Sequence, residues 1–539
     1  MTAEDDHRVF WADEVADEIE ARAPDEPIVI KGGISPSGVP HLGNMNEVMR
    51  GHFVAEVLRE RGHSVRQVFT ADDRDPLRGL PRTLAALDGT LVGLGDVDAG
   101  ALGRNLGVPY TDIADPFGCC DSYGDHFSRL IQRGADALEV EIDLLSTTAL
   151  YEDGTLEAQT RQALERRDRV RSILSEFQAK VDADYVPFNP ICANCGTVTE
   201  TVTDIDLDAG TVAYRCTDLE AGGETIEGCG HEGTASLREG KLPWRLEWPA
   251  QWASLEVDFE PFGKDHAEGS WPSGQALASE IFDTAPPVPL AYEWFTLDGE
   301  PFSSSAGNVI LVSDVLELIE PEVLRFFFAK DPGRARDFSI ERLDLLVDEF
   351  DRFEAIYFGE VEGTPDEQAY AERVYPLVVP AIDEDRVRLP YTFAAVLGMT
   401  ADPEVREQIA RKQGHLPDDA SQATVETALA RVERARTWAQ RTDNEFAYEL
   451  KRTTIPDHSF DPSMVAALDE LADYVEAGHD GEAIQGEMYE IARRHDLEVS
   501  SFFAAGYRLF FDGEEGPRLG EFLGKLERDF VVDRLRRER

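Results

Sequence analysis

The sequence predicts an α/β protein in which a parallel-sheet domain carries a small cysteine-rich insertion and is followed by an all-helical region. Three observations carry this prediction. Short apolar runs alternate with a helical pattern near the N-terminus, cysteines gather in the Thr- and Gly-rich stretch 187–237, and helical periodicity dominates from about residue 345 onward. Alternating strands and helices are typical of parallel sheets.

The N-terminal elements are expected in the order helix, strand, helix, strand. A helix is predicted over 11–23, a strand over 27–33, a long helix from 41 to about 61, and a second strand over 64–70. In such a sheet, ligands bind beyond the carboxyl ends of the strands. The loop that precedes the long helix is therefore the expected site.

Farther along, the pattern predicts helices from 122 to about 145 and over 156–179, and a short strand over 211–215. We expect three domains. The α/β domain spans 1–343 and includes the insertion at 185–240, a helical stem spans 344–455, and a last helical domain spans 456–539.

The charge balance indicates a protein suited to concentrated salt. The chain carries 106 acidic against 52 basic residues, a net charge of −54, and only eight of the cations are lysine. Repulsion between charges acts over about 8 Å at physiological ionic strength and about 3 Å at 1 M salt. High working salt explains this composition best, and an ordinary acidic protein is the alternative.

The sequence gives no sign of a membrane segment. A bilayer span needs about 18 apolar residues in succession, which the chain lacks. The first ten residues also lack the pattern of a signal peptide. We expect a cytoplasmic protein with no membrane partner.

The cysteines of the insertion indicate a metal site. Cys192 and Cys195 form a C-x₂-C pair, and Cys216, Cys229 and His231 follow within the same stretch. A structural Zn²⁺ takes four thiolate or imidazole ligands. The five candidates leave open whether His231 completes the shell, and free buried cysteines are the alternative.

The loop 32–44 has the parts of a phosphate site. Its glycines allow close approach of the backbone, and the following helix offers unpaired N–H groups, beside which His41 and Asn44 add side-chain donors. Taken alone, the loop could also do no more than turn the chain.

The segment His41-Leu-Gly-Asn44 resembles the HIGH signature of class I aminoacyl-tRNA synthetases in the form found in the archaeal-type lysyl enzymes. About 260 residues later, Pro301-Phe-Ser-Ser-Ser-Ala-Gly-Asn308 resembles the second signature of that class. Its serines and its Gly-Asn ending fit, whereas its lysines are absent. Other segments similar to the family are 10–17, 72–78, 242–249 with Trp252, 262–266 and 324–329.

This resemblance implies a Rossmann-type class I synthetase catalytic domain with a zinc-binding insertion and a helical anticodon-binding region. It implies ATP with Mg²⁺, L-lysine and tRNA(Lys) as substrates and partners, and a lysyl-adenylate intermediate. The implied catalytic residues are His41, Asn44, Ser303, Ser304 and Ser305. The implied ATP-binding residues are Pro36, Gly38, His41, Gly43, Asn44, Asn46 and Ser304. The implied lysine-binding residues are Gly33, Ser35, Trp244, Trp248, His266 and Tyr292.

The absent lysines of the second signature leave a role to be filled, because a cation there would stabilise the charge of the leaving pyrophosphate. Candidates are Lys31, Lys264, Arg334, Arg336, a magnesium ion and a potassium-rich medium. The aromatic residues Trp248 and Trp252 lie at helical spacing, so a core role is an alternative for each of them.

A protein of this charge repels tRNA at long range, so binding must rest on local arginines and base stacking. The candidate stretches are 161–171, 431–441 and 534–539. Two other functions stay open. One is a glutamyl-type class I synthetase, which would need converging arginines, and the other is a non-catalytic paralogue that binds tRNA or nucleotides.

Overall fold

A computed structural model describes residues 9–178, 181–221, 224–302, 308–383, 385–456 and 458–538. The chain divides into two compact units. The first unit comprises residues 1–315, 324–339 and 356–380, and the second comprises 316–323, 340–355 and 381–539. The three domain boundaries expected from the sequence remain a prediction.

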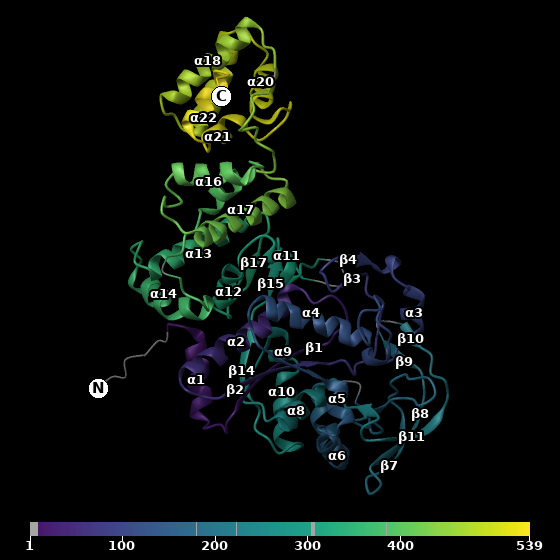
Figure 1. Cartoon of the computed structure of the whole chain (residues 1–539). Coiled ribbons are helices and arrows are strands. Elements are labelled where there is room, and N and C mark those ends of the chain that lie inside the picture. The colour runs from purple at the N-terminus through teal and green to yellow at the C-terminus, as the bar shows by residue number, and fades with distance from the viewer. Residues whose placement is uncertain are drawn as a thin grey trace, which may run out of the picture. The chain divides into compact units, whose positions relative to one another are not determined.

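The first unit is organised around a five-stranded parallel sheet (Figure 1). Its strands, in chain order, are β1 (Ile28–Ile34), β2 (Val65–Ala71), β5 (Asp143–Ser146), β13 (Phe259–Gly263) and β14 (Val288–Tyr292), and all neighbours run parallel. Their spatial order is β14-β13-β1-β2-β5. This is the doubly wound arrangement, in which the strand order reverses beside β1 and a ligand crevice opens there. The predicted parallel α/β fold is confirmed.

Helices cover both faces of this sheet. Gly51 of α2 (Met45–Glu60) lies against Ile30, since a Cβ there would come within 3.2 Å of that side chain. On the other face, Val29 packs in one cluster with Trp252 of α8 (Trp244–Leu255) and Trp271 of α10 (Trp271–Glu280). The alternation of side chains along β1 therefore determines which helix each residue meets.

The helix predicted from 122 to about 145 is wrong beyond Ala137. Helix α4 is Tyr123–Ala137, and residues 143–146 form the edge strand β5. The helix ends where Glu139 takes a left-handed conformation, with φ of 55°. Helices commonly end on a glycine there, so a glutamate gave no signal of the stop. The helix predicted over 156–179 is two helices, α6 (Glu157–Glu165) and α7 (Arg167–Ser175).

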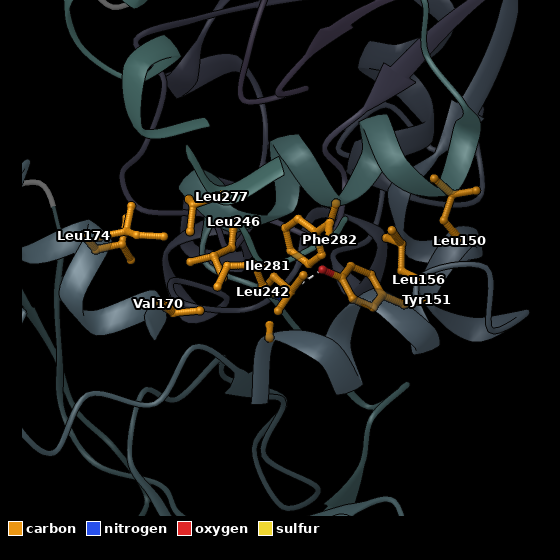
Figure 2. Packing of buried hydrophobic residues seen from close by; sticks show 13 residues of the cluster. Leu150, Tyr151, Leu156, Val170, Leu174, Leu242, Leu246, Leu277, Ile281 and Phe282 are labelled. Carbon is orange, nitrogen blue, oxygen red and sulfur yellow. Dashed lines mark hydrogen bonds between the residues drawn. The ribbon is translucent and has the colours of Figure 1, made fainter. Parts of the chain in front are cut away.

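A buried cluster ties α8 and α10 to the helices around them (Figure 2). Leu246 and Leu277 pack with Leu156 and with residues of α7 and of α5 (Thr147–Glu152). The hydroxyl of Tyr151 accepts a hydrogen bond from the Leu242 N–H at 2.8 Å and donates one to Glu247 at 2.7 Å. These hydrogen bonds fix Leu242, where the chain leaves the insertion, to the sheet domain.

The insertion is a set of short strands. They are β6 (Asn189–Pro190), β7 (Val202–Asp206), β8 (Thr211–Arg215), β9 (Leu219–Ala221), β10 (Glu224–Ile226), β11 (Glu232–Ser236) and β12 (Gly240–Lys241). The sheet β11-β8-β7 is antiparallel. Its small core includes Val212, Tyr214, Cys192 and Cys216. The strand predicted over 211–215 is confirmed as β8.

The remaining elements of the first unit are short, apart from α1 and α14. They are α1 (Trp11–Ala21), η1 (Leu42–Asn44), β3 (Thr83–Ala85), β4 (Leu91–Gly93), η2 (Leu94–Asp96), α3 (Ala99–Arg104), η3 (Tyr110–Asp112), α9 (Lys264–Glu268), β15 (Phe295–Leu297), β16 (Glu300–Pro301), β17 (Arg336–Phe338) and α14 (Pro365–Val378). Helices α11 (Val312–Leu316), α12 (Pro321–Ala329) and α13 (Leu343–Tyr357) contribute residues to both units.

The second unit is helical, as predicted. Its helices are α15 (Tyr391–Gly398), α16 (Pro403–Lys412), α17 (Gln422–Thr442), α18 (Pro462–Glu476), α19 (Gly481–Arg494), α20 (Val499–Phe511), α21 (Leu519–Leu523) and α22 (Arg528–Leu535). Within this unit the buried Arg431 pairs with Glu320 at 2.7 Å and with Asp351 at 2.6 Å. Within the described ranges, no helix combines the length and apolar character that a bilayer crossing requires.

Candidate active site

A cavity of about 450 Å³ opens at the carboxyl ends of the central strands. Gly33 and Ile34 of β1, Gly263 of β13 and Tyr292 of β14 line it. The start of α2 closes another side. The cavity lies where a doubly wound sheet binds its ligand, so the position follows from the strand order.

The first signature loop forms one end of the cavity. The side-chain oxygen of Asn44 accepts a hydrogen bond from the His41 N–H at 2.9 Å, and the His41 ring stacks on Phe302 with centroids 4.9 Å apart. A Cβ at Gly43 would lie 2.9 Å from the His41 ring, so only glycine fits beside that stack. The N–H groups that begin α2 follow directly, and they favour an anion.

His41 acts at this end as a neutral group. Burial lowers the pKa of its imidazole to about 4, so the ring carries no charge near neutral pH. Its Nδ1 is buried without a hydrogen-bond partner in the described structure. The ring can therefore offer a hydrogen bond to a ligand, although it adds no positive charge.

The structure places only some of the residues predicted for ATP along the cavity. His41, Gly43, Asn44 and Asn46 line it, whereas Pro36 and Gly38 lie in the preceding loop and are not part of the wall. The side chain of Asn46 accepts a hydrogen bond from Arg50 at 2.9 Å. Ser303, Ser304 and Ser305 lie outside the described residues.

Only some of the residues predicted to bind lysine line the cavity. Gly33, His266 and Tyr292 line the cavity, and Ser35 does not. Trp244 and Trp248 stand behind His266, with ring centroids 5.3 and 5.6 Å from it. Burial lowers the pKa of His266, so it too is neutral near neutral pH. The two tryptophans support the wall from behind.

Beneath this wall lies a buried carboxylate that the sequence analysis missed. Glu260 is 2% exposed and pairs with Lys31, also 2% exposed, at 2.9 Å. The indole N–H groups of Trp248, at 2.9 Å, and of Trp252 donate to the same carboxylate. Trp252 therefore belongs to the structural cluster around Glu260.

A second missed carboxylate lines the cavity itself. Glu47, in the first turn of α2, accepts hydrogen bonds from the Gly33 N–H at 2.8 Å and from the Tyr292 hydroxyl at 3.4 Å. Burial, together with the negative charge of Glu260, raises its pKa to about 8. In the sequence, an acidic residue at a helix start is ordinary, so nothing marked Glu47 as a site residue.

The four side-chain candidates for the missing cation have different partners. Lys31 is committed to Glu260, and Arg334 is exposed and pairs with Asp331 at 3.2 Å. Arg336 lies in β17, and its buried Nε has no hydrogen-bond partner among the described residues. Lys264 pairs with Glu293 and lies 4.7 Å from the ring of Trp294, which lines the cavity.

The cysteines of the insertion come together as the spacing suggested. The sulfur atoms of Cys192, Cys195, Cys216 and Cys229 all lie within 4.8 Å of one another. The Cys192–Cys229 and Cys195–Cys216 separations are 3.6 and 3.7 Å. Four converging thiols suit a tetrahedral metal ion. His231 is not part of this group.

A second group of metal-ligand type was not foreseen. Asp115, Cys119, Cys120 and His126 also place their donor atoms within 4.8 Å of one another. The His126 Nδ1 lies 3.2 Å from Asp115 and 3.4 Å from Cys119, while its Nε2 lies 2.8 Å from the Ala85 carbonyl. A carbonyl at one ring nitrogen directs the other toward a metal. The adjacent cysteines, which suit a disulfide poorly, were the available signal.

Each of the three arginine-rich stretches has arginines that pair with acidic residues of the chain itself. Arg166 pairs with Asp283 at 2.6 Å, and Arg171 pairs with Asp168 at 2.7 Å. Arg431 is buried, as described above, and Arg536 pairs with Asp473 at 2.8 Å. These four arginines are therefore not available to contact a polyanion unless their internal pairs open.

Comparison with known proteins gives a consistent result. The profile that describes "tRNA synthetases class I (K)" matches residues 9–381. The chain is 66% identical to a lysine–tRNA ligase of Haloarcula marismortui, over 98% of this chain and 97% of that protein. It is 67% identical to one of Halobacterium salinarum, over 98% and 97%. It is 34% identical to one of Pyrococcus horikoshii, over 98% and 100%.

Proposed function

The chain belongs to the class I tRNA synthetases of the lysine type, and we propose that it joins L-lysine to tRNA(Lys) at the expense of ATP. The observation that carries the proposal is the cavity at the reversal point of the sheet. Its walls include the His41–Asn44 loop at a helix N-terminus, several aromatic rings and the carboxylate of Glu47.

The reaction has two steps. The lysine carboxylate attacks the α-phosphorus of ATP, and pyrophosphate leaves to give lysyl-adenylate. A ribose hydroxyl of the tRNA end then attacks the lysyl carbonyl, and AMP leaves. Neither step needs a side-chain nucleophile, so positioning and charge stabilisation supply the catalysis. His41, Asn44 and the serines Ser303, Ser304 and Ser305 would hold phosphate oxygens.

Charge on the triphosphate still has to be balanced. Mg²⁺ usually keeps several waters and binds through substrate phosphates, so it needs no dedicated protein cage. Among the protein cations we favour Lys264, because its neighbours Gly263 and Asp265 line the cavity. Lys31 is unsuitable, since freeing it would leave Glu260 buried and uncompensated.

We propose that Cys192, Cys195, Cys216 and Cys229 bind a structural Zn²⁺, which would cross-link the strands and loops of the insertion. The donor set of Asp115, Cys119, Cys120 and His126 fits a second ion. Metal analysis of the purified chain, compared with Cys195→Ser and His126→Ala, checks the two groups separately. Each variant should lose one ion that the other keeps.

The helical second unit is proposed to contact the anticodon of tRNA(Lys), and the enzyme is proposed to work in the cytoplasm with the translation machinery. Among the described residues that line the cavity, none is an arginine, which disfavours glutamate as the amino acid. A side-chain carboxylate would otherwise need such a partner.

Amino-acid-dependent exchange of pyrophosphate into ATP tests the proposal, because exchange isolates the activation step. The assay is run in molar potassium chloride with each amino acid, with and without tRNA. Exchange with lysine alone is expected. Exchange with glutamate would move the chain to a glutamyl-type activity, and no exchange with any amino acid would favour a non-catalytic paralogue.

A further inference from the structure

The rim of the active-site cavity carries an exposed tryptophan, Trp294. Its side chain lines the cavity and is 53% exposed, whereas the other six of the chain's seven tryptophans are buried or half-buried. Single exposed apolar residues are common on protein surfaces and need no functional explanation. Trp294 differs from them because its ring borders a cavity, is held in place and has a cation beside it.

The position of this indole ring is fixed by its surroundings. Trp294 and the preceding Glu293 form the link between β14 and β15. The Glu293 N–H donates a hydrogen bond to the Pro332 carbonyl at 2.8 Å, and the Arg336 N–H donates one to the Trp294 carbonyl at 3.4 Å. The indole N–H donates to Asp265 at 3.1 Å. Backbone and side-chain hydrogen bonds therefore hold the ring at the rim, although it stays exposed.

One face of the ring meets a positive charge. The Lys264 ammonium group lies 4.7 Å from the ring centroid and pairs with Glu293. The two side chains of this pair are 41% and 28% exposed, and such pairs contribute little to stability. A phosphate that arrives at the rim can therefore compete for Lys264. Within the described ranges, no other aromatic ring packs on Trp294, so the indole can accept a planar ligand.

We propose that Trp294 is a stacking platform for an adenine ring, with Lys264 placed to receive a phosphate of the same nucleotide. This inference rests on the proposed function, because both nucleotide substrates of that reaction bring an adenosine, ATP and the 3′ end of tRNA. The flat indole suits a nucleobase, since every base has a face that stacks on an aromatic ring. The exposure of Trp294 favours the tRNA end, which must enter the cavity from solvent.

Stacking also suits the charge of this protein. The net charge of −54 repels a polynucleotide at long range, and no lysine or arginine is among the described residues that line the cavity. Phosphate contacts alone would hold a nucleotide weakly in concentrated salt, which weakens them. Burial of two ring faces against each other depends on no charge, so salt does not screen it.

The test compares Trp294→Ala and Trp294→Phe with the parent in molar potassium chloride. It measures the Michaelis constant for ATP in pyrophosphate exchange without tRNA, and the dissociation constants of tRNA(Lys) and of the same tRNA without its terminal adenosine. Losing one base stack should weaken the affected ligand by roughly 5- to 150-fold in Trp294→Ala. Trp294→Phe keeps an aromatic face and should recover most of that loss. The matched control is Phe177→Ala, which removes a ring that is 38% exposed outside the cavity and should behave like the parent.

The three ligands identify the source of the adenine ring. If it is the tRNA end, Trp294→Ala weakens the intact tRNA and leaves the shortened tRNA and ATP unchanged. If it is ATP, the Michaelis constant for ATP rises instead. Either pattern, or both together, supports the proposal. Unchanged values for all three ligands, equal losses for the intact and the shortened tRNA, or a Trp294→Phe variant as weak as Trp294→Ala would overturn it.

Failure of this inference is distinguishable from failure of the proposed function. Lysine-dependent pyrophosphate exchange by the parent chain decides the function. If the parent exchanges with lysine while the Trp294 variants bind ATP and both tRNAs like the parent, the chain is a lysine ligase that holds its adenine rings elsewhere. If the parent exchanges with no amino acid, the function fails, and the two tRNA dissociation constants still test Trp294.

Discussion

Two buried glutamates of the first unit lie in contrasting surroundings. Glu260 on β13 pairs with Lys31 and accepts two indole N–H groups, so each of its oxygens is occupied. Glu47 on α2 lines the cavity and has only neutral donors. The contrast teaches that burial alone does not assign a role. A carboxylate that pairs with a cation of the protein stabilises the fold. A carboxylate beside a cavity that has no such cation is available to a ligand.

The largest expected effect is on stability and concerns Glu260, the carboxylate that pairs with Lys31. Lys31→Met leaves Glu260 buried without its cation, which should reduce the free energy of unfolding by about 3–5 kcal/mol. Denaturant unfolding in molar potassium chloride measures this. A loss below about 1 kcal/mol would show that the pair has no structural role, given what breaking a buried pair usually costs.

The second effect concerns Glu47 and has a distinct pH dependence. Its pKa rises from an ordinary 4.5 to about 8 on folding, so the protonated group contributes stability that is fully present below 4.5 and lost as the pH rises through 8. Without ligand, the parent should therefore lose ~2–4 kcal/mol relative to Glu47→Gln between these limits.

Melting temperatures of both proteins across that range, in one salt concentration, check this difference. Lys31, Glu260 and Tyr292 face Glu47 from the neighbouring strands and are the same in both proteins, so their contributions cancel. Parallel curves for the two proteins would contradict the assignment of a raised pKa to Glu47.

A smaller effect is expected from Tyr292→Phe, which removes one of the two donors to Glu47. A single neutral hydrogen bond contributes about 0.5–1.5 kcal/mol, so the Michaelis constant for lysine should rise by roughly 2- to 10-fold. The turnover number should change less. A large loss of turnover with unchanged lysine affinity would instead place Tyr292 in the chemical step.

The smallest effect is expected at the cavity rim. Asp265→Asn removes a carboxylate that is exposed to solvent, where an ion pair with a ligand is worth up to about 1 kcal/mol. Lysine binding should weaken by less than about fivefold. A loss of about 30-fold or more, as expected for a buried charge pair, would mean that Asp265 is the contact of a lysine ammonium group, and the contrast between buried and exposed carboxylates would fail.

The sequence correctly predicted those parts of the molecule that are formed by residues close together along the chain. The local pattern was enough to predict two such segments. One is the run from β1 through the His41–Asn44 loop into α2, and the other contains the Cys192–Cys195 pair. Strand β5 was hidden because α4 ends on a left-handed glutamate and not on a glycine.

The roles of the two carboxylates could not be predicted from the sequence for a different reason. Glu260 lies 229 residues after its partner Lys31, and Glu47 lies 245 residues before Tyr292. Their roles depend on which side chains the sheet brings beside them, which no local pattern contains. The Asp115–His126 group is closer in sequence, but its mixed ligands do not follow a common spacing.

Proton release on lysine binding tests the central claim most directly. At pH 7 the free enzyme holds Glu47 protonated, because its pKa is about 8, and an ammonium group of lysine that pairs with Glu47 requires the ionised carboxylate. His41 and His266 stay neutral and contribute no proton. Calorimetry in buffers of different ionisation enthalpy should find about one proton released per lysine by the parent and none by Glu47→Gln. Equal proton release by the two proteins would contradict the account.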